Sequence, residues 1–181
     1  LNKKNQVIYF EGIDTYADIF LNKEKILSSN NMFHPWEAEI SNLLKNGKNE
    51  LEIYFRSPID EVSDQMAQLN YQLPADNDQA GKTSPFSRKA PFHYGWDWGP
   101  CFVTSGIWRN VSLIGWNDWH VKRSSIINCG VESNLAHLLL ELDIMSELNE
   151  KASIFIEEPN AQITFESSID LKKGNNFFRE K

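Results

Sequence analysis

The feature that most constrains the fold of this chain is a two-residue alternation of apolar and polar side chains. The clearest instance is Glu50–Phe55, in which Leu51, Ile53 and Phe55 point to one side of an extended strand. Residues i and i+2 share a face in extended backbone and not in a helix. Similar short runs rich in aromatic and β-branched residues occur at Val7–Phe10, Tyr16–Leu21, Ile26–Leu27 and Ile107–Trp116. The sequence therefore predicts an all-β protein.

Apart from a single helical turn predicted at Ser41–Gly47, helical spacing is confined to one segment. Pro58 suits the first turn of a helix, and Val62, Met66 and Leu69 then recur at intervals of three or four residues. This spacing predicts a short helix from Pro58 to about Leu69. Between the predicted strands, the polar run Asn22–Lys25 predicts a hairpin turn.

The residue composition of the chain changes near residue 116. Past Trp116 aromatic residues become sparse and Glu and Asn fill the turns, which favours a domain boundary there. The remainder, 116–181, is shorter than the roughly 100 residues of a complete immunoglobulin-type sandwich, so we expect a truncated second domain. The chain also opens at Leu1 without Met, which suggests an excised fragment. Strands at sandwich spacing are predicted at His120–Ile127, Ala136–Ile144, Ala152–Glu157 and Gln162–Glu166.

Charge and cysteine usage narrow the possible partners. The net charge is −7 and Lys and Arg are scattered singly among acids, which argues against nucleic acid as a partner. No apolar run reaches membrane-spanning length, so no membrane partner is expected. Cys101 and Cys129 lie far apart, outside any metal-binding spacing. One disulfide is arithmetically possible, but the sequence favours free, mostly buried thiols.

A long polar loop, Tyr71–Lys89, leads directly into the densest aromatic cluster of the chain, Phe92–Pro100. A loop of this length within a compact domain is usually functional or disordered. In the cluster, Asp97 stands between Trp96 and Trp98. A carboxylate there can accept hydrogen bonds from vicinal sugar hydroxyls while an indole covers the C–H side of the ring. Alternatively, the tryptophans are core residues and Asp97 binds only nearby backbone amides. The residue types alone slightly favour this structural interpretation.

Two blocks of sequence carry a family resemblance. Phe10–Asn22, followed by Leu44–Leu51, resembles the jelly-roll sugar-binding domain that the β-galactosidases, β-glucuronidases and β-mannosidases of glycoside hydrolase family 2 share. Arg88–Pro100, which leads to Thr104–Arg109, is similar to the β-mannosidase branch, in which a Gly-Trp-Asp-Trp-Gly-Pro turn is typical. Here that turn occupies Gly95–Pro100. The resemblance covers about residues 7–115.

The resemblance implies a fold and a context. It implies a jelly-roll, galactose-binding-like sandwich at 1–115 that lacks its first strands, followed by a partial immunoglobulin-like β-sandwich at 116–181. Such enzymes release terminal β-D-mannose from non-reducing ends with retention, need no cofactor or metal, and use two glutamates of a (β/α)8 barrel. The implied partners are therefore a β-mannoside and the catalytic barrel of the same polypeptide. An extracytoplasmic or lysosome-like compartment is the further expectation.

The resemblance also assigns site residues. It implies that the loop with the Gly95–Pro100 turn reaches into the sugar pocket of the barrel. In that pocket Asp97 would recognise mannose hydroxyls and Trp96 or Trp98 would line the site. His93, Arg88 and Lys89 are secondary candidates: His93 fits a structural hydrogen-bonding role, and Arg88 fits an ion pair with a neighbouring domain. No catalytic residue is expected in this chain, because the paired acids Glu37/Glu39 and Glu50/Glu52 lie on predicted solvated strand faces.

Other interpretations stay open. The chain can be a stand-alone carbohydrate-binding module, the same region of a β-galactosidase or β-glucuronidase, or a purely structural or protein-interaction sandwich. The remaining tryptophans receive structural roles. We expect Trp36 to pack under the first sandwich, Trp108 to anchor its last strand, and Trp116 and Trp119 to lie at the interface between the two sandwiches.

Overall fold

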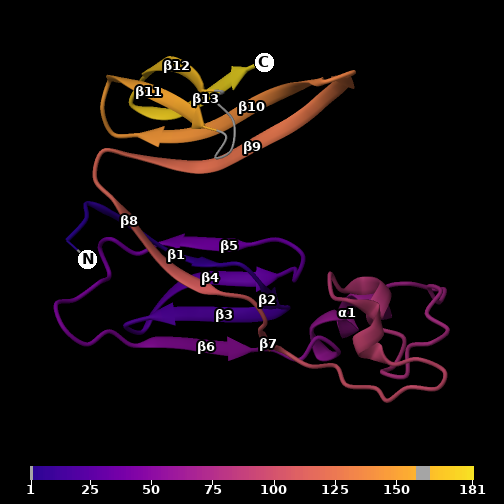
Figure 1. Cartoon of the computed structure of the whole chain (residues 1–181). Coiled ribbons are helices and arrows are strands. Elements are labelled where there is room, and N and C mark those ends of the chain that lie inside the picture. The colour runs from indigo at the N-terminus through magenta and orange to yellow at the C-terminus, as the bar shows by residue number, and fades with distance from the viewer. Residues whose placement is uncertain (1, 158–163) are drawn as a thin grey trace. The chain divides into compact units, whose positions relative to one another are not determined.

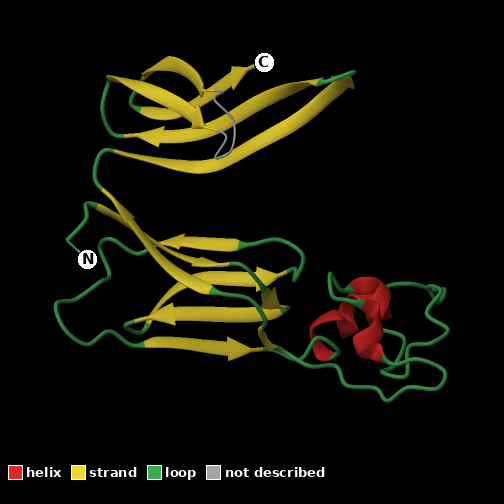
Figure 2. Cartoon of the chain, in the orientation of Figure 1, coloured by secondary structure: helices red, strands yellow, loops and turns green. Residues whose placement is uncertain are grey.

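The computed structural model describes residues 2–157 and 164–181. Strands dominate, and a single short α-helix, α1 (Ser63–Ala67), is present among the described residues (Figures 1 and 2). The predicted all-β class is confirmed. The chain divides between Gly115 and Trp116 into two compact units. Within the described ranges, no helix is long and apolar enough to cross a membrane.

The first unit is built on two layers of strands. In one sheet the order is β5–β1–β8 and in the other it is β4–β3–β6, while β2 and β7 pair separately (Figure 1). Most of the predicted strands of this region are therefore present. Their bounds are β1 Asn5–Phe10, β2 Ile13–Asp14, β3 Tyr16–Leu21, β4 Glu24–Asn30, β5 Trp36–Glu39, β6 Leu51–Phe55, β7 Gly106–Ile107 and β8 Val111–Trp116.

The core of this unit follows from the two-residue alternation. Ala17, Ile19 and Leu21 of β3 are buried on one face of their strand and pack with buried residues of β1 and β5. Burial of such aliphatic side chains is the main favourable term in folding. Trp36 packs against this cluster, which confirms its predicted structural role. The alternation in β6 holds for Ile53 and Phe55, which are half-buried against the core, whereas Leu51 is exposed.

Local turns agree with the sequence. Asn22 and Lys23 connect β3 to β4 with positive φ values of 52° and 75°, the conformation of a two-residue hairpin turn whose twist matches that of the strands.

The helix predicted from Pro58 to about Leu69 is shorter than expected. It begins as a 3₁₀ turn at Asp60–Val62 and continues as α1, and Val62 is its one buried residue among these segments.

The second unit contains long strands. β9 (Trp119–Glu132) pairs with β10 (Leu135–Ser146), which also pairs with β13 (Gly174–Glu180). β11 (Glu150–Glu157) pairs antiparallel with β12 (Thr164–Leu171). The sequence missed β13, and Gln162 and Ile163 of the last predicted strand lie outside the described residues. An immunoglobulin-like identity for this unit remains a prediction.

The cysteines and the boundary tryptophans are only partly as predicted. Cys101 and Cys129 are free, but Cys101 is half-buried and Cys129 is exposed, so the expectation that both are buried is wrong for Cys129. Trp116 stacks on His120, with ring centroids 4.7 Å apart, and Trp119 is half-exposed. A role for Trp116 and Trp119 between the two units stays a prediction.

Candidate functional site

The segment from Lys89 to Thr104 carries the aromatic cluster and forms the aromatic loop. A buried ion pair, which the sequence analysis did not identify, closes this loop at its base. Lys89 stands before the aromatic residues and Thr104 after them. The Lys89 ammonium donates to Asp14 Oδ1 at 2.6 Å and to the Thr104 carbonyl at 2.6 Å. Lys89 is only 2% exposed, and Asp14, in β2, is also buried. Both ends of the loop therefore meet at the Lys89 ammonium, which is paired with a carboxylate of the sandwich.

His93 extends this network. Its Nδ1 lies 3.0 Å from the Thr104 hydroxyl and 3.7 Å from Asp14 Oδ2. Burial lowers the pKa of His93, and the positive charge of Lys89 lowers it further, while Asp14 acts in the opposite direction. Burial also lowers the pKa of Lys89, although Asp14 opposes that shift. A histidine held neutral in this way can serve as a hydrogen-bonding group at the base of the loop, away from its aromatic tip.

The Asp97 turn is exposed at the tip of the loop. Asp97 Oδ1 accepts a hydrogen bond from the Trp98 amide at 3.0 Å, which leaves Oδ2 without a partner among the described residues. Trp96 is 45% exposed and Trp98 is 83% exposed, and their rings meet edge to face with centroids 5.6 Å apart. The alternative that these tryptophans are core residues is therefore wrong. The arrangement offers a free carboxylate oxygen on a turn that also exposes two indoles.

The backbone of this turn is held from outside by Gln79. The Gln79 side-chain amide donates to the carbonyls of Trp96 and Gly99, and its backbone N–H donates to the Tyr94 carbonyl at 2.8 Å. Gly95 lies against the same side chain with a φ of +107°. Sequence reasoning missed Gln79 and Asp14, because their partners are 17 to 75 residues away along the chain. The signal available was a charged residue, Asp14, next to the predicted strand Tyr16–Leu21.

Arg88 contributes through its backbone. Its carbonyl accepts a hydrogen bond from the Met32 amide at 3.0 Å, and it forms an isolated parallel bridge with Asn31. Within the described part of the chain, its exposed side chain has no ion-pair partner. An ion pair between Arg88 and a neighbouring domain therefore stays a prediction.

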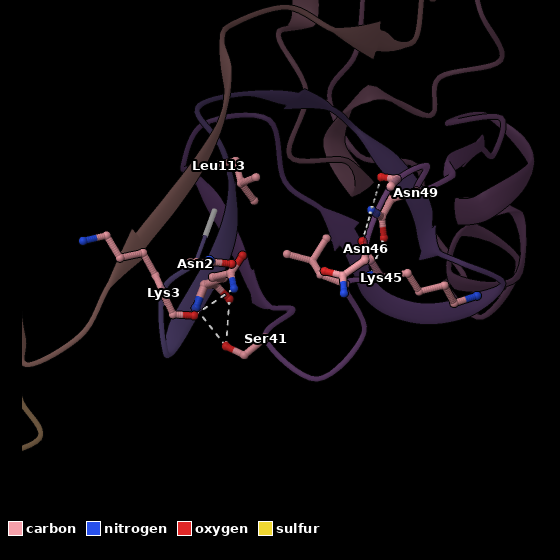
Figure 3. Close-up of a pocket in the computed structure, with 10 residues that line it drawn as sticks. Asn2, Lys3, Ser41, Lys45, Asn46, Asn49 and Leu113 are labelled. Atoms are coloured by element: carbon pink, nitrogen blue, oxygen red, sulfur yellow. Dashed lines mark hydrogen bonds between the residues drawn. The ribbon is translucent and has the colours of Figure 1, made fainter.

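Pockets open on the first unit at several places. One has a volume of about 470 Å³ and lies over the buried network. Its apolar walls include Phe92 and Trp108, and the Trp108 ring carries the Arg109 guanidinium 4.1 Å from its centroid. Another, of about 380 Å³, has a polar lining that includes Ser41 and Asn46 (Figure 3). Asp97, Trp96 and Trp98 line neither of these two pockets.

The family follows from comparison with known proteins. Residues 1–109 match the glycosyl hydrolase 2 galactose-binding domain-like family. The chain belongs to this family. The galactose-binding-like domain predicted for the first part of the chain is thereby confirmed, and the Asp97 turn lies within the matched residues.

Relatives of this glycosyl hydrolase 2 chain include named β-mannosidases. It is 41% identical over 108 residues to β-mannosidase B of Thermothelomyces thermophilus, covering 59% of this chain and 12% of that protein. It is 30% identical to the β-mannosidase of Capra hircus, covering 96% of this chain and 20% of that protein. The crystal structure of the Dictyoglomus thermophilum β-D-mannosidase superposes with a TM-score of 0.86 at 32% identity, covering 98% of this chain and 22% of that one.

These matches show how much of each relative corresponds to this chain. The chain spans 12 to 20% of the length of the curated relatives described above. It is homologous to glycoside hydrolase family 2 β-mannosidases over the N-terminal fraction of those proteins. The remaining length of these relatives implies further domains in them.

Proposed function

We propose that this chain is a non-catalytic N-terminal region of a retaining β-mannosidase that hydrolyses terminal non-reducing β-D-mannose residues. In this proposal the loop that carries Asp97 reaches into a sugar pocket supplied by a catalytic barrel of the same polypeptide. No cofactor or metal ion is required. The Gly-Trp-Asp-Trp-Gly-Pro turn at Gly95–Pro100 and the 32% identity to a β-D-mannosidase structure favour this specificity over that of a β-galactosidase or β-glucuronidase.

The observation that carries the proposal is the exposure of the Asp97 turn. A carboxylate at the tip of a loop, with one oxygen already oriented by the Trp98 amide, presents its other oxygen to a ligand. Hydroxyl groups of a sugar donate well to such an oxygen, and the bonds are stronger than those to neutral acceptors. Exposed indoles beside it can cover the apolar side of the ring. Trp96 and Trp98 are proposed to line the sugar site in this way.

Neither Glu37/Glu39 nor Glu50/Glu52 resembles a hydrolytic pair. Glu37 and Glu39 of β5 are both exposed, as are Glu50 and Glu52 beside and within β6, which confirms their predicted solvated faces. A retaining glycosidase needs one carboxyl that its surroundings keep protonated, opposite a second one about 5–5.5 Å away. We therefore assign the two catalytic glutamates to the barrel and none to this chain.

Substitution of Asp97 in the complete polypeptide tests the proposal. Asp97→Ala is expected to lower kcat/KM for an aryl β-D-mannoside by about 30- to 1,000-fold, which corresponds to roughly 2–4 kcal/mol of lost charge-assisted contact in the transition state. Asp76→Ala is the matched control, because Asp76 is another exposed aspartate of the preceding loop. An unchanged kcat/KM for Asp97→Ala would remove Asp97 from the sugar site.

The isolated chain provides a second test. If the catalytic glutamates belong to another domain, the purified chain does not hydrolyse aryl β-D-mannosides at any measurable rate above the buffer. Turnover by the isolated chain, retained after extensive purification, would contradict the assignment of catalysis to a barrel.

A stand-alone carbohydrate-binding module is the second candidate, and the exposure of Trp98 favours it. An indole that is 83% exposed can stack on a sugar without help from another domain. Titration of the isolated chain with manno-oligosaccharides, followed by tryptophan fluorescence, separates the two candidates. Saturable quenching that is lost in Trp98→Ala supports the module. No response supports a loop that completes a site only in the larger enzyme.

A further inference from the structure

The polar loop before the aromatic cluster is an ordered support. The buried Asp78 carboxylate accepts hydrogen bonds from the amides of Ala80 and Ser84 at 2.7 and 2.8 Å. The Lys82 ammonium donates to the carbonyls of Ala75 and Asp76 at 2.7 and 2.9 Å. These bonds close the loop on itself and fix the position of Gln79 within it. A carboxylate that binds two backbone amides in this way is a common device for ordering turns.

Gln79 joins this support to the sugar-facing turn. Its side-chain amide binds the carbonyls of Trp96 and Gly99, which lie on either side of Asp97 in the sequence. Within the turn itself, the Gly99 amide is 3.4 Å from the Trp96 carbonyl, which is a long hydrogen bond. The Gln79 side chain, which belongs to the preceding polar loop, therefore makes shorter hydrogen bonds to this turn than the bond that the turn makes within itself.

Gly95 shows how closely the two loops fit. Its φ of +107° is a conformation that favours glycine, and a Cβ atom built there would lie 3.0 Å from Gln79 Cγ. Gln79 thus packs against the backbone before Asp97 and bonds to the backbone on both sides of it.

We infer that Gln79 is a positioning residue for the Asp97 carboxylate and so sets the precision of sugar-hydroxyl recognition. The inference rests on the proposed function of Asp97. A group that grips a substrate must be held within about 0.5 Å of its productive geometry, and its supporting residues do this without touching the substrate. Gln79 is exposed, and exposed hydrogen bonds add little to global stability, so its loss is expected to disturb the turn and leave the sandwich folded.

Activity of the complete polypeptide tests the inference through a double-mutant cycle. Gln79→Ala is expected to lower kcat/KM for an aryl β-D-mannoside by at least about tenfold. Gln79→Ala combined with Asp97→Ala is expected to be no worse than Asp97→Ala alone, because a positioning residue acts only through the group that it positions. Effects that multiply in the double variant would overturn the inference. Gln72→Ala, an exposed glutamine of the same loop, is the control and retains full activity.

An isosteric variant adds a pH signature. In Gln79→Glu a carboxylate faces the Trp96 and Gly99 carbonyls, so it repels them where the amide bound them. Near the ordinary glutamate pKa of about 4.3 the protonated group can donate again. Measured relative to the unaltered protein at each pH, the activity of Gln79→Glu is expected to recover as the pH falls. A ratio that does not change with pH would contradict donation by residue 79.

The isolated chain gives a readout that does not depend on activity. The edge-to-face Trp96–Trp98 pair should give a coupled indole signal in circular dichroism, which Gln79→Ala abolishes while the urea midpoint of unfolding stays unchanged. A signal that survives in Gln79→Ala overturns the inference. If the signal is lost but Asp97→Ala leaves the activity unaltered, Gln79 holds the turn and the proposed role of Asp97 fails.

Discussion

The Lys89 ammonium lies 2.6 Å from Asp14 Oδ1 in the interior of the first unit, and this pair joins β2 to the start of the aromatic loop. The same ammonium binds the Thr104 carbonyl, where the loop returns. A buried charge is tolerated only with such partners, because taking it out of water costs several kcal/mol. The pair therefore links the stability of the sandwich to the geometry of the loop.

Removal of one partner of the Asp14–Lys89 pair should show how much the stability of the first unit depends on it. Lys89→Met leaves the Asp14 carboxylate buried and unpaired, and we expect it to lower the free energy of unfolding by about 3–5 kcal/mol. The double variant Asp14→Leu/Lys89→Met should recover part of this loss, because neither charge is then buried. Urea unfolding measures both. Lys48→Met, at an exposed lysine, is the control and should change stability by less than about 0.5 kcal/mol.

His93 should titrate below its usual range. Burial and the Lys89 charge lower its pKa from 6.5, so the unfolded chain binds more protons than the folded chain just below pH 6.5. Stability is therefore expected to fall as the pH drops through this window. An NMR titration of the His93 ring checks the shift, and Lys89→Met should raise the pKa, because it removes the like charge. A His93 pKa above 6.5 in the unaltered chain would contradict this arrangement.

The fold was largely readable from the sequence, and the base of the site was not. The sequence predicted a strand at Tyr16–Leu21, and β3 buries Ala17, Ile19 and Leu21 on one face, because alternate residues of an extended strand share a face. The exposure of Trp98 and the Asp14–Lys89 pair depend on contacts between distant segments, which no local pattern encodes. β13 was missed because Phe177 and Phe178 are adjacent and polar residues surround them, so apolar and polar residues do not alternate along this strand.

Asp18 provides an acid-sensitive contribution to stability. Hydrogen bonds from Lys25 and Ser28, together with the Arg56 guanidinium, outweigh burial and hold the Asp18 pKa well below 3.8. A lowered carboxyl pKa contributes stability that is present above pH 3.8 and is lost as the pH falls below it.

Substitution of Asp18 tests this contribution. Asp18→Asn should reduce the free energy of unfolding by about 1–2 kcal/mol at neutral pH, which is less than hydrogen bonds to a buried charge contribute, because solvent screens this partly exposed site. At about pH 2 the two proteins should differ less, since Asp18 is then largely protonated in the unfolded chain, which binds this proton at a higher pH than the folded chain does. Urea unfolding at both pH values measures this. A difference that does not shrink in acid would exclude the linkage.

Gly12 makes room for Trp108. A Cβ atom at Gly12 would lie 2.5 Å from the Trp108 indole nitrogen, whereas one at Gly106 would meet nothing within 4 Å. Gly12→Ala is therefore expected to displace the indole and cost about 1–3 kcal/mol of stability, as overpacking usually does. Tryptophan fluorescence and urea unfolding report both effects. Gly106→Ala is the matched control, and an equal loss in the two variants would argue against contact with Trp108 as the cause.

The meeting of both loop ends at the Lys89 ammonium has an evolutionary consequence. Because Lys89 binds both Asp14 of β2 and the Thr104 carbonyl, the segment between them forms a closed excursion, and its exposed residues, such as Trp98, are not constrained by the strands. Such exposed residues can be exchanged without rebuilding the sheets beneath the excursion. A common scaffold can in this way present different sugar-facing tips, and substrate preference can diverge while the architecture stays the same.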